Sequence, residues 1–364
     1  MNRDNICNKE LIILIFNFYI STYLLFNMGG MVKQDAWIAT IVAIIFSLPF
    51  MLIYGKIMSF YPKKNLFQIL EIIFGKIVGI FFSVIIIVYL FVLSSFILRD
   101  FVDFVRITSM RNTPSLAIMI LIGILSTYFL KQGIQCIVAW SKFFLRIIGL
   151  FFVVTLLFLI PHMRLQNLYP IFENGIMEIL KASFALVTFP FTEIFIFTTF
   201  FDSVIPNKKS KNVFFIGLLI SSFAVIGFII SNILLLGGEI YSNTYFSGYE
   251  SIKRLTIQGE FQRLEIIVTT AFTIVQFLEM NFCILGICKG IKNIFKLKSY
   301  KRIVSVIMII VVIMSKVVSI SIMDYQYFDQ HYWPIIGLVI QIIFPIIICI
   351  IAFIKSKFKK NKNN

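Results

Sequence analysis

The sequence TFPFTE at residues 188–193 places a proline and a glutamate inside an apolar run that spans 183–201. Proline removes a backbone hydrogen-bond donor, so a helix is interrupted there. A second stretch, NMGGM at 27–31, ends the apolar run 11–28 with two glycines, which unwind at little steric cost. Unwound backbone survives within a membrane only where it is buried in protein or lines a cavity. The two stretches therefore indicate two discontinuous membrane helices.

Apolar runs account for most of the chain, which has 364 residues, 59% of them hydrophobic and 14% charged. A soluble domain carries about 25% charged residues, and a bilayer core about 30 Å thick needs roughly 20 apolar residues per helix. The runs lie at 11–28, 36–59, 77–98, 114–130, 137–160, 183–201, 213–237, 264–288, 303–323 and 334–354. The interruptions fall in the first and sixth runs, which is the placement expected of two inverted five-helix repeats.

The predicted fold is an all-α integral membrane protein of about ten transmembrane helices, with discontinuous helices 1 and 6. It forms a single transmembrane domain over residues 1–364. Repeat one covers about 11–160, repeat two covers about 183–354, and a basic tail follows at 355–364. A short interfacial helix is expected at Leu66–Phe74.

The distribution of positive charge predicts the orientation. If the N-terminus is cytoplasmic, the cytoplasmic segments hold 23 of the 33 lysines and arginines and the external segments hold 8. Such an excess predicts that both termini are cytoplasmic. The first apolar run lacks a small-residue cleavage site, so we expect it to be retained as a helix and not removed as a signal peptide.

Several classes of function lack support in the sequence. The two histidines and five cysteines show no metal-ligand spacing, and HExxH, Walker A and GxGxxG motifs are absent. We therefore expect no catalytic residues, no metal and no cofactor, and we interpret the cysteines as buried structural thiols. The net charge is +16, and the positively charged residues lie between apolar runs and at the C-terminus. This distribution suits orientation in a lipid bilayer and not nucleic-acid binding.

A site for a small ligand is predicted near the membrane midplane, between the two broken helices. Freed amides and carbonyls can bind such a ligand, and half-helix N-termini suit a carboxylate. Alternatively, the glycine pair only allows close packing and the proline only kinks its helix. Ser95 and Thr273 are placed in the site by analogy between spans alone. The predicted ligand-binding residues are Asn27, Met28, Gly29, Gly30, Ser95, Phe189, Pro190, Thr192, Glu193 and Thr273.

Ionisable residues within spans are functional candidates because burying a charge in lipid is costly. Glu193 could hold a proton, contact a ligand amine, or only hydrogen-bond a broken helix. Arg99 and Asp103 are spaced i,i+4 beside Asp100, which favours an ion pair at a helix end. Lys316 can snorkel toward the nearer end of its span.

The longest predicted external loop, 238–263, is rich in tyrosine, serine and asparagine and carries both signs of charge. It is either a solvated loop or an extracellular gate or docking surface, and the sequence favours neither.

An ordered set of short motifs resembles the endospore germination permeases, the B subunits of spore germinant receptors. These belong to the amino acid–polyamine–organocation transporter superfamily. The match covers most of the chain and thins after residue 300. The motifs are KQDAWIA at 33–39, RDF at 99–101 with Asp103 and Phe104, TP at 113–114, GI at 133–134, LYP at 168–170, ENGI at 173–176, FPF at 189–191 with Glu193, and QRLE at 262–265.

The resemblance implies a subunit of the inner spore membrane that senses a nutrient germinant, often an amino acid. It also implies two partners, an A subunit with membrane helices and a lipoprotein C subunit. A second hypothesis is a proton- or ion-coupled amino-acid transporter that works alone. Composition and the two breaks fit both, and only the ordered motifs favour the receptor. Neighbouring genes for A and C subunits would separate the two hypotheses.

Overall fold

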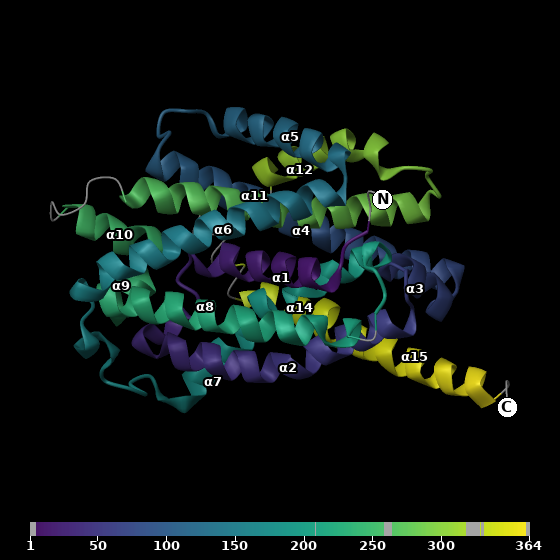
Figure 1. Ribbon diagram of the computed structural model, residues 1–364, viewed down its shortest axis with the longest axis horizontal. Coiled ribbons are helices and arrows are strands. Elements are labelled where there is room, and N and C mark those ends of the chain that lie inside the picture. Colours follow the sequence, from purple (N-terminus) through teal and green to yellow (C-terminus); the bar gives the residue numbers. More distant parts are fainter. Residues whose placement is uncertain (1–4, 208, 258–263, 318–327, 329–330, 362–364) are drawn as a thin grey trace.

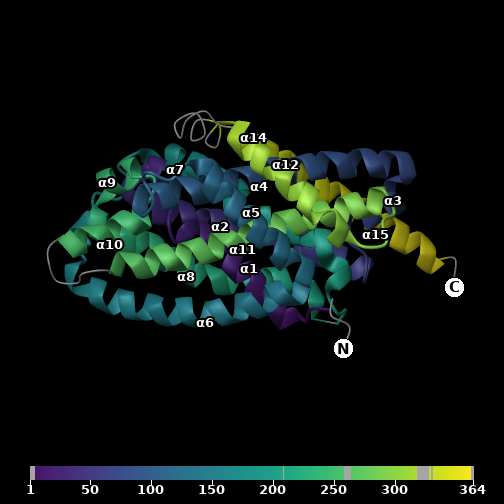
Figure 2. The same ribbon diagram turned by 90° about the horizontal axis from the view of Figure 1, so that it is seen from above.

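The computed structural model describes residues 5–207, 209–257, 264–317, 328 and 331–361. These residues form an elongated bundle of helices (Figures 1 and 2). The first and last helices of the chain reach one end of the bundle, which we call the terminal end. The short helices α9 (Gly238–Asn243) and α10 (Ser247–Ile257) lie at the opposite end, which we call the loop end.

Each of the ten predicted apolar runs contains a helix, which confirms the all-helical membrane fold. Seven segments of the described chain are long and apolar enough to cross a membrane by length and composition, and two shorter apolar helices accompany them. The short helix expected at residues 66–74 is α3 (Leu66–Phe74). The ten runs correspond to α1 (Asn8–Tyr23), α2 (Ala36–Phe60), α4 (Lys76–Thr108), α5 (Ser115–Gln132), α6 (Ile134–Leu159), α7 (Gly175–Leu186) with η4 (Val187–Phe191) and η5 (Glu193–Ser203), α8 (Val213–Leu236), α11 (Leu264–Ile294), α12 (Val304–Val317), and α14 (Trp333–Gly337) with η8 (Leu338–Ile343) and α15 (Phe344–Asn361).

The sixth and eighth runs lie at the centre of the bundle. In Gly175–Ser203 and Thr269–Ile294, 83% of the most apolar window is buried, against 33–50% in the other five candidate spans. Apolar side chains such as Ile77 of α4 and Phe223 of α8 are exposed on the outside of the bundle, where a bilayer would contact them. Helix α1 packs against α8 and α11, and it is buried on all sides from Asn17 to Tyr23.

Small residues bring the central helices close together. A Cβ atom on Gly286 of α11 would lie 2.9 Å from Leu90 on α4 and 2.9 Å from Thr199 on η5. Gly217 of α8 leaves similar room for Ile15 of α1, at 2.9 Å. Such contacts let helix backbones approach closely inside a membrane. The central helices therefore form a tightly packed frame around the breaks.

One expectation about side chains is confirmed and one is corrected. Arg99 Nε lies 2.7 Å from Asp103 Oδ2, which is the predicted i,i+4 ion pair. Cys283 and Cys288 are buried, but Cys7 is exposed, so the cysteines are not uniformly buried thiols. Cys7 precedes the first turn of α1, at the terminal end, where the core does not cover it.

Candidate functional site

The first break lies at the loop end of α1. The helix ends at Tyr23, earlier than the predicted run, and Gly29 then adopts a φ of 72°, the left-handed region that favours glycine. The amide of Gly30 donates to the carbonyl of Asn27 over 2.8 Å, so the chain turns instead of continuing the helix. It then runs through η1 (Gly30–Asp35) into α2. The interruption of the first span is therefore near the loop end of the bundle.

The second break divides the sixth span. Phe189 is extended, with φ −141° and ψ 114°, between α7 and η5. The carbonyl of Phe191 accepts a hydrogen bond from Tyr19 OH at 2.7 Å, and the carbonyl of Thr192 accepts one from the amide of Phe195 at 2.9 Å. A buried carbonyl that loses its helical partner is costly unless another donor satisfies it. Tyr19 of α1 therefore stabilises the broken backbone at Phe191.

A cavity of about 420 Å³ lies where the two breaks meet. Both interruptions contribute, because residues 26–31 and Phe189 lie on its wall. Small side chains on α7, Ala182 and Ala185, leave it room. The described lining residues are Phe26, Asn27, Met28, Gly29, Gly30, Met31, Asp100, Ala182, Ala185, Leu186, Phe189, Ser242, Asn243, Tyr245 and Pro334. This volume falls within the usual range for a small-molecule pocket.

The structure brings half of the predicted ligand-binding residues to this cavity. Those on its wall are Asn27, Met28, Gly29, Gly30 and Phe189. Ser95 and Thr273 are absent from the described lining, and their hydroxyls donate to the carbonyls of Phe91 and Thr269 in their own helices, both over 2.7 Å. Pro190, Thr192 and Glu193 are also absent from that lining and are buried. A binding role for any of these residues stays a prediction.

Glu193 belongs to a buried polar network that joins three helices. Its Oε1 accepts a hydrogen bond from Tyr89 OH over 3.1 Å, and Tyr89 OH accepts one from Gln341 Nε2 over 2.7 Å. Gln341 Oε1 in turn accepts from Thr192 Oγ1 over 2.6 Å. Trp333 stacks on Tyr89 with ring centroids 5.2 Å apart, and its neighbour Pro334 lines the cavity. The network therefore joins Glu193 to η8 and, through Tyr89, to α14, which contributes Pro334 to the cavity wall.

A second buried acid, Glu279 on α11, was missed by the sequence analysis. It is 2% exposed and accepts a hydrogen bond from Ser21 Oγ of α1. The signal was present, since Glu279 stands in the apolar run 264–288 just as Glu193 stands in the sixth. No proline or glycine break accompanies Glu279, so the sequence did not single it out as it did Glu193.

Helix α9 and the residues that follow it to Tyr245 lie along the loop end of the cavity. Tyr241 OH donates to the carbonyl of Met28 over 2.8 Å, and Asn27 Nδ2 donates to the carbonyl of Ser242 over 2.9 Å. Lys33 of η1 and Glu239 of α9 form an ion pair that also joins these two segments. The described part of the predicted 238–263 loop thus contains two short helices and is hydrogen-bonded to the first break. Its role as a solvated loop or as a gate or docking surface stays a prediction.

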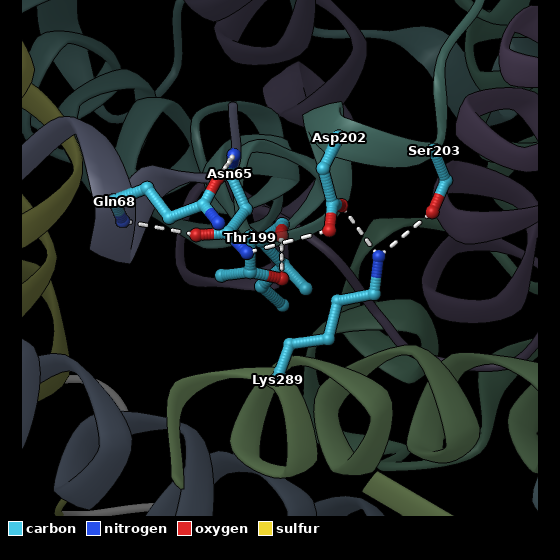
Figure 3. A network of polar contacts seen from close by, with 7 residues as sticks. Asn65, Gln68, Thr199, Asp202, Ser203 and Lys289 are labelled. Atoms are coloured by element: carbon cyan, nitrogen blue, oxygen red, sulfur yellow. Dashed lines mark hydrogen bonds and ion pairs between the residues drawn. The ribbon is translucent and has the colours of Figure 1, made fainter. Parts of the chain in front are cut away.

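At the terminal end, a compact polar cluster ties the two central helices together. Figure 3 shows Lys289 reaching from α11 to Asp202 and Ser203 at the end of η5, over 2.5 and 2.7 Å. Asn65, which caps α3, donates to the other carboxylate oxygen of Asp202 over 3.4 Å. The amide of Ile6 donates to the carbonyl of Ser203 over 2.7 Å. The cavity therefore lies toward the loop end of a bundle that is fastened at its terminal end.

Comparison with known proteins bears on both family and fold. A family model described as "Spore germination protein" matches residues 5–321. Spore germination protein KB of Bacillus subtilis (strain 168) is 24% identical over 365 residues, covering 98% of this chain and 97% of the relative. Spore germination protein XB of Bacillus anthracis is 24% identical over 355 residues, covering 95% of each.

Among solved structures, the chain is similar to Mhp1, a nucleobase-cation-symport-1 family transporter, in a closed conformation with bromovinylhydantoin bound. The TM-score is 0.65 at 10% sequence identity, over 90% of this chain and 75% of the other. This likeness shows a shared transporter fold and nothing about the ligand. The resemblance drawn from the motifs is confirmed by the family model and the relatives.

Proposed function

The chain belongs to the spore germination protein family, and we propose that it is the membrane subunit of a receptor for nutrient germinants. It is a multi-pass, non-enzymatic membrane protein of the germinant-receptor and permease class. The observation that supports the proposal is the cavity at the two helix breaks, because its wall includes unwound backbone from both. Such backbone is found at the ligand sites of transporters with broken helices.

In this proposal the germinant is a small molecule, an amino acid, that binds in the cavity. A ligand shifts a protein between two conformations only by its differential affinity for them. Helix α9 contacts the first break and lines the cavity, so closure over a ligand would alter these contacts. The change would then pass to partner subunits.

The proposed partners are a receptor A subunit and a lipoprotein C subunit, and the proposed location is the inner spore membrane with both termini cytoplasmic. The excess of positive charge supports this orientation, since the predicted cytoplasmic segments hold 23 of the 33 lysines and arginines. In this orientation the terminal end of the bundle would face the cytoplasm, and the loop end would face the outside.

A transporter that works alone is the second candidate. The buried acids Glu193 and Glu279 favour it, because proton- and ion-coupled carriers use carboxylates within their spans. In that case the cavity would carry an amino acid across the membrane together with a proton or cation.

One pair of measurements separates the two. A strain with this chain in its sole nutrient receptor is tested for germination with single amino acids, before and after deletion of the gene. The receptor proposal expects deletion to abolish the response to one nutrient while a trigger that bypasses the receptor still works. If deletion leaves every response intact, and proteoliposomes of the purified chain accumulate the amino acid, the transporter is the better account.

A further inference from the structure

The carboxyl group of Glu279 lies in one of the two most deeply buried spans. It belongs to α11 and is 2% exposed. Its Oε2 is hydrogen-bonded to Ser21 Oγ of α1, and Ser21 is its one hydrogen-bond partner among the described residues. An ionised carboxylate has about four acceptor sites, and burying it with so few donors is costly. The hydrogen bonding around Glu279 therefore favours a neutral carboxyl group.

The charges around Glu279 favour the neutral form as well. Asp100 of α4 acts on Glu279 electrostatically, and Cys283, one turn along α11, interacts with both Glu279 and Glu193 of η5. A nearby group that carries the same charge disfavours ionisation. The ion pairs of the described chain do not include Glu279, since the cations of α4, α6 and α11 that form such pairs do so with other acids. These pairs are Arg99 with Asp103, Lys142 with Glu10, and Lys289 with Asp202.

The hydrogens available at Ser21 lead to the same conclusion. Ser21 Oγ lies 2.6 Å from the carbonyl oxygen of Phe18 in α1, and it is also within hydrogen-bonding distance of Glu279 Oε2. Two oxygens this close need a hydrogen between them, and a serine hydroxyl has only one. If Ser21 gives its hydrogen to an ionised Glu279, the contact with Phe18 has none. If Glu279 is protonated and donates to Ser21, then Ser21 can donate to Phe18 and both contacts are satisfied.

We propose that Glu279 is a proton-binding site, which carries a proton in this arrangement and donates it in a hydrogen bond to Ser21. The proton then joins the first broken helix to α11. Ser21 lies in the last turn of α1, two residues before the helix ends at Tyr23, and the first break follows. Movement of α1 away from α11 would separate the donor from its acceptor, so a bound proton favours the arrangement seen here. This inference does not depend on which ligand the cavity binds.

The test compares infrared spectra of the purified full-length protein and its variants in detergent at pH 7, where an exposed glutamate, with a pKa of about 4.3, is ionised. A protonated carboxyl group has a C=O stretching band that a carboxylate lacks. Glu279→Gln is expected to lose the band of one protonated carboxyl group per molecule. Glu178→Gln, on the exposed surface of α7, is the matched control and should lose the bands of one carboxylate instead.

Ser21→Ala removes the acceptor of the proposed hydrogen bond, so it is expected to change the protonated-carboxyl band, and it serves where Glu279→Gln does not fold. Ser83→Ala is its control and should leave that band as it is, because the Ser83 hydroxyl donates within its own helix to the carbonyl of Gly79 over 2.7 Å. Loss of a carboxylate band in Glu279→Gln would show that Glu279 is ionised and would overturn the inference. Protonated-carboxyl bands that are all unchanged in Ser21→Ala would overturn it too.

Discussion

Lys289 Nζ lies 2.5 Å from Asp202 Oδ1, and this ion pair joins α11 to the end of the sixth span. Lys289 also contacts Ser203, whose carbonyl accepts a hydrogen bond from the amide of Ile6. Lys289 is almost fully buried, whereas the Asp202 side chain is 28% exposed. Removing one partner of such a pair leaves the other charge uncompensated. The contact therefore stabilises the packing of the helices at the terminal end.

We predict that Lys289→Met loosens this end of the bundle. The expected loss of stability is about 2 kcal/mol, less than for a fully buried pair because Asp202 reaches solvent. Native Cys288, which is buried beside Lys289, then becomes reactive and reports the opening. Thiol labelling with mass spectrometry measures it, and Lys298→Met, in the exposed segment beyond α11, is the control. Unchanged Cys288 labelling in Lys289→Met would show that the pair does not close this end.

Glu193→Gln keeps the size and most hydrogen bonds of Glu193 but removes its charge and its titratable proton. Because Tyr89 and Gln341 can still support the amide, we expect the protein to be made and inserted normally. Spores carrying it should respond poorly to nutrient and normally to a trigger that bypasses the receptor. Glu178→Gln is the surface control. Loss of the protein would indicate a structural role, and a normal nutrient response would show that neither charge nor proton is needed.

The proposed orientation predicts which positions are accessible from outside the cell. Asn243, at the exposed end of α9, should be labelled by an impermeant thiol reagent after replacement by cysteine. Lys209, exposed in the basic segment after η5, should be labelled only after permeabilisation. The background is a variant in which Cys7, the exposed native cysteine, is serine. External labelling at position 209 would contradict the arrangement of ten spans with both termini inside.

The order and type of the helices could be predicted from the sequence because a bilayer requires long apolar runs, and those runs are visible without any structure. The two breaks could be predicted for the same kind of reason, since NMGGM and TFPFTE interrupt the apolar runs with glycine and proline. The rotation of each helix about its axis could not be predicted from the sequence. Ser95 and Thr273 were expected in the site and are absent from the described lining of the cavity, so their binding role stays a prediction.

The rotation of a helix leaves little trace in this sequence for a physical reason. The central helices are apolar on nearly all faces, so no amphipathic stripe shows which side faces the cavity. Asp100 and Tyr245 show how far apart in the sequence contacting residues can be, because their hydrogen bond joins residues 145 positions apart. Gln341 meets Tyr89 across 252 positions in the same way. Such long-range pairs arise from packing and leave no local pattern.

The most direct test of the account is to fill the cavity. Ala185→Phe adds a ring at a residue of the cavity wall, while Ala117→Phe adds the same ring on the exposed, lipid-facing side of α5. The measurement is the germination of spores that carry each variant in their sole nutrient receptor, with the amount of protein checked by immunoblot. The account predicts that Ala185→Phe abolishes the nutrient response at normal protein level and that Ala117→Phe does not. A normal response from Ala185→Phe spores would contradict the claim that this cavity binds the germinant.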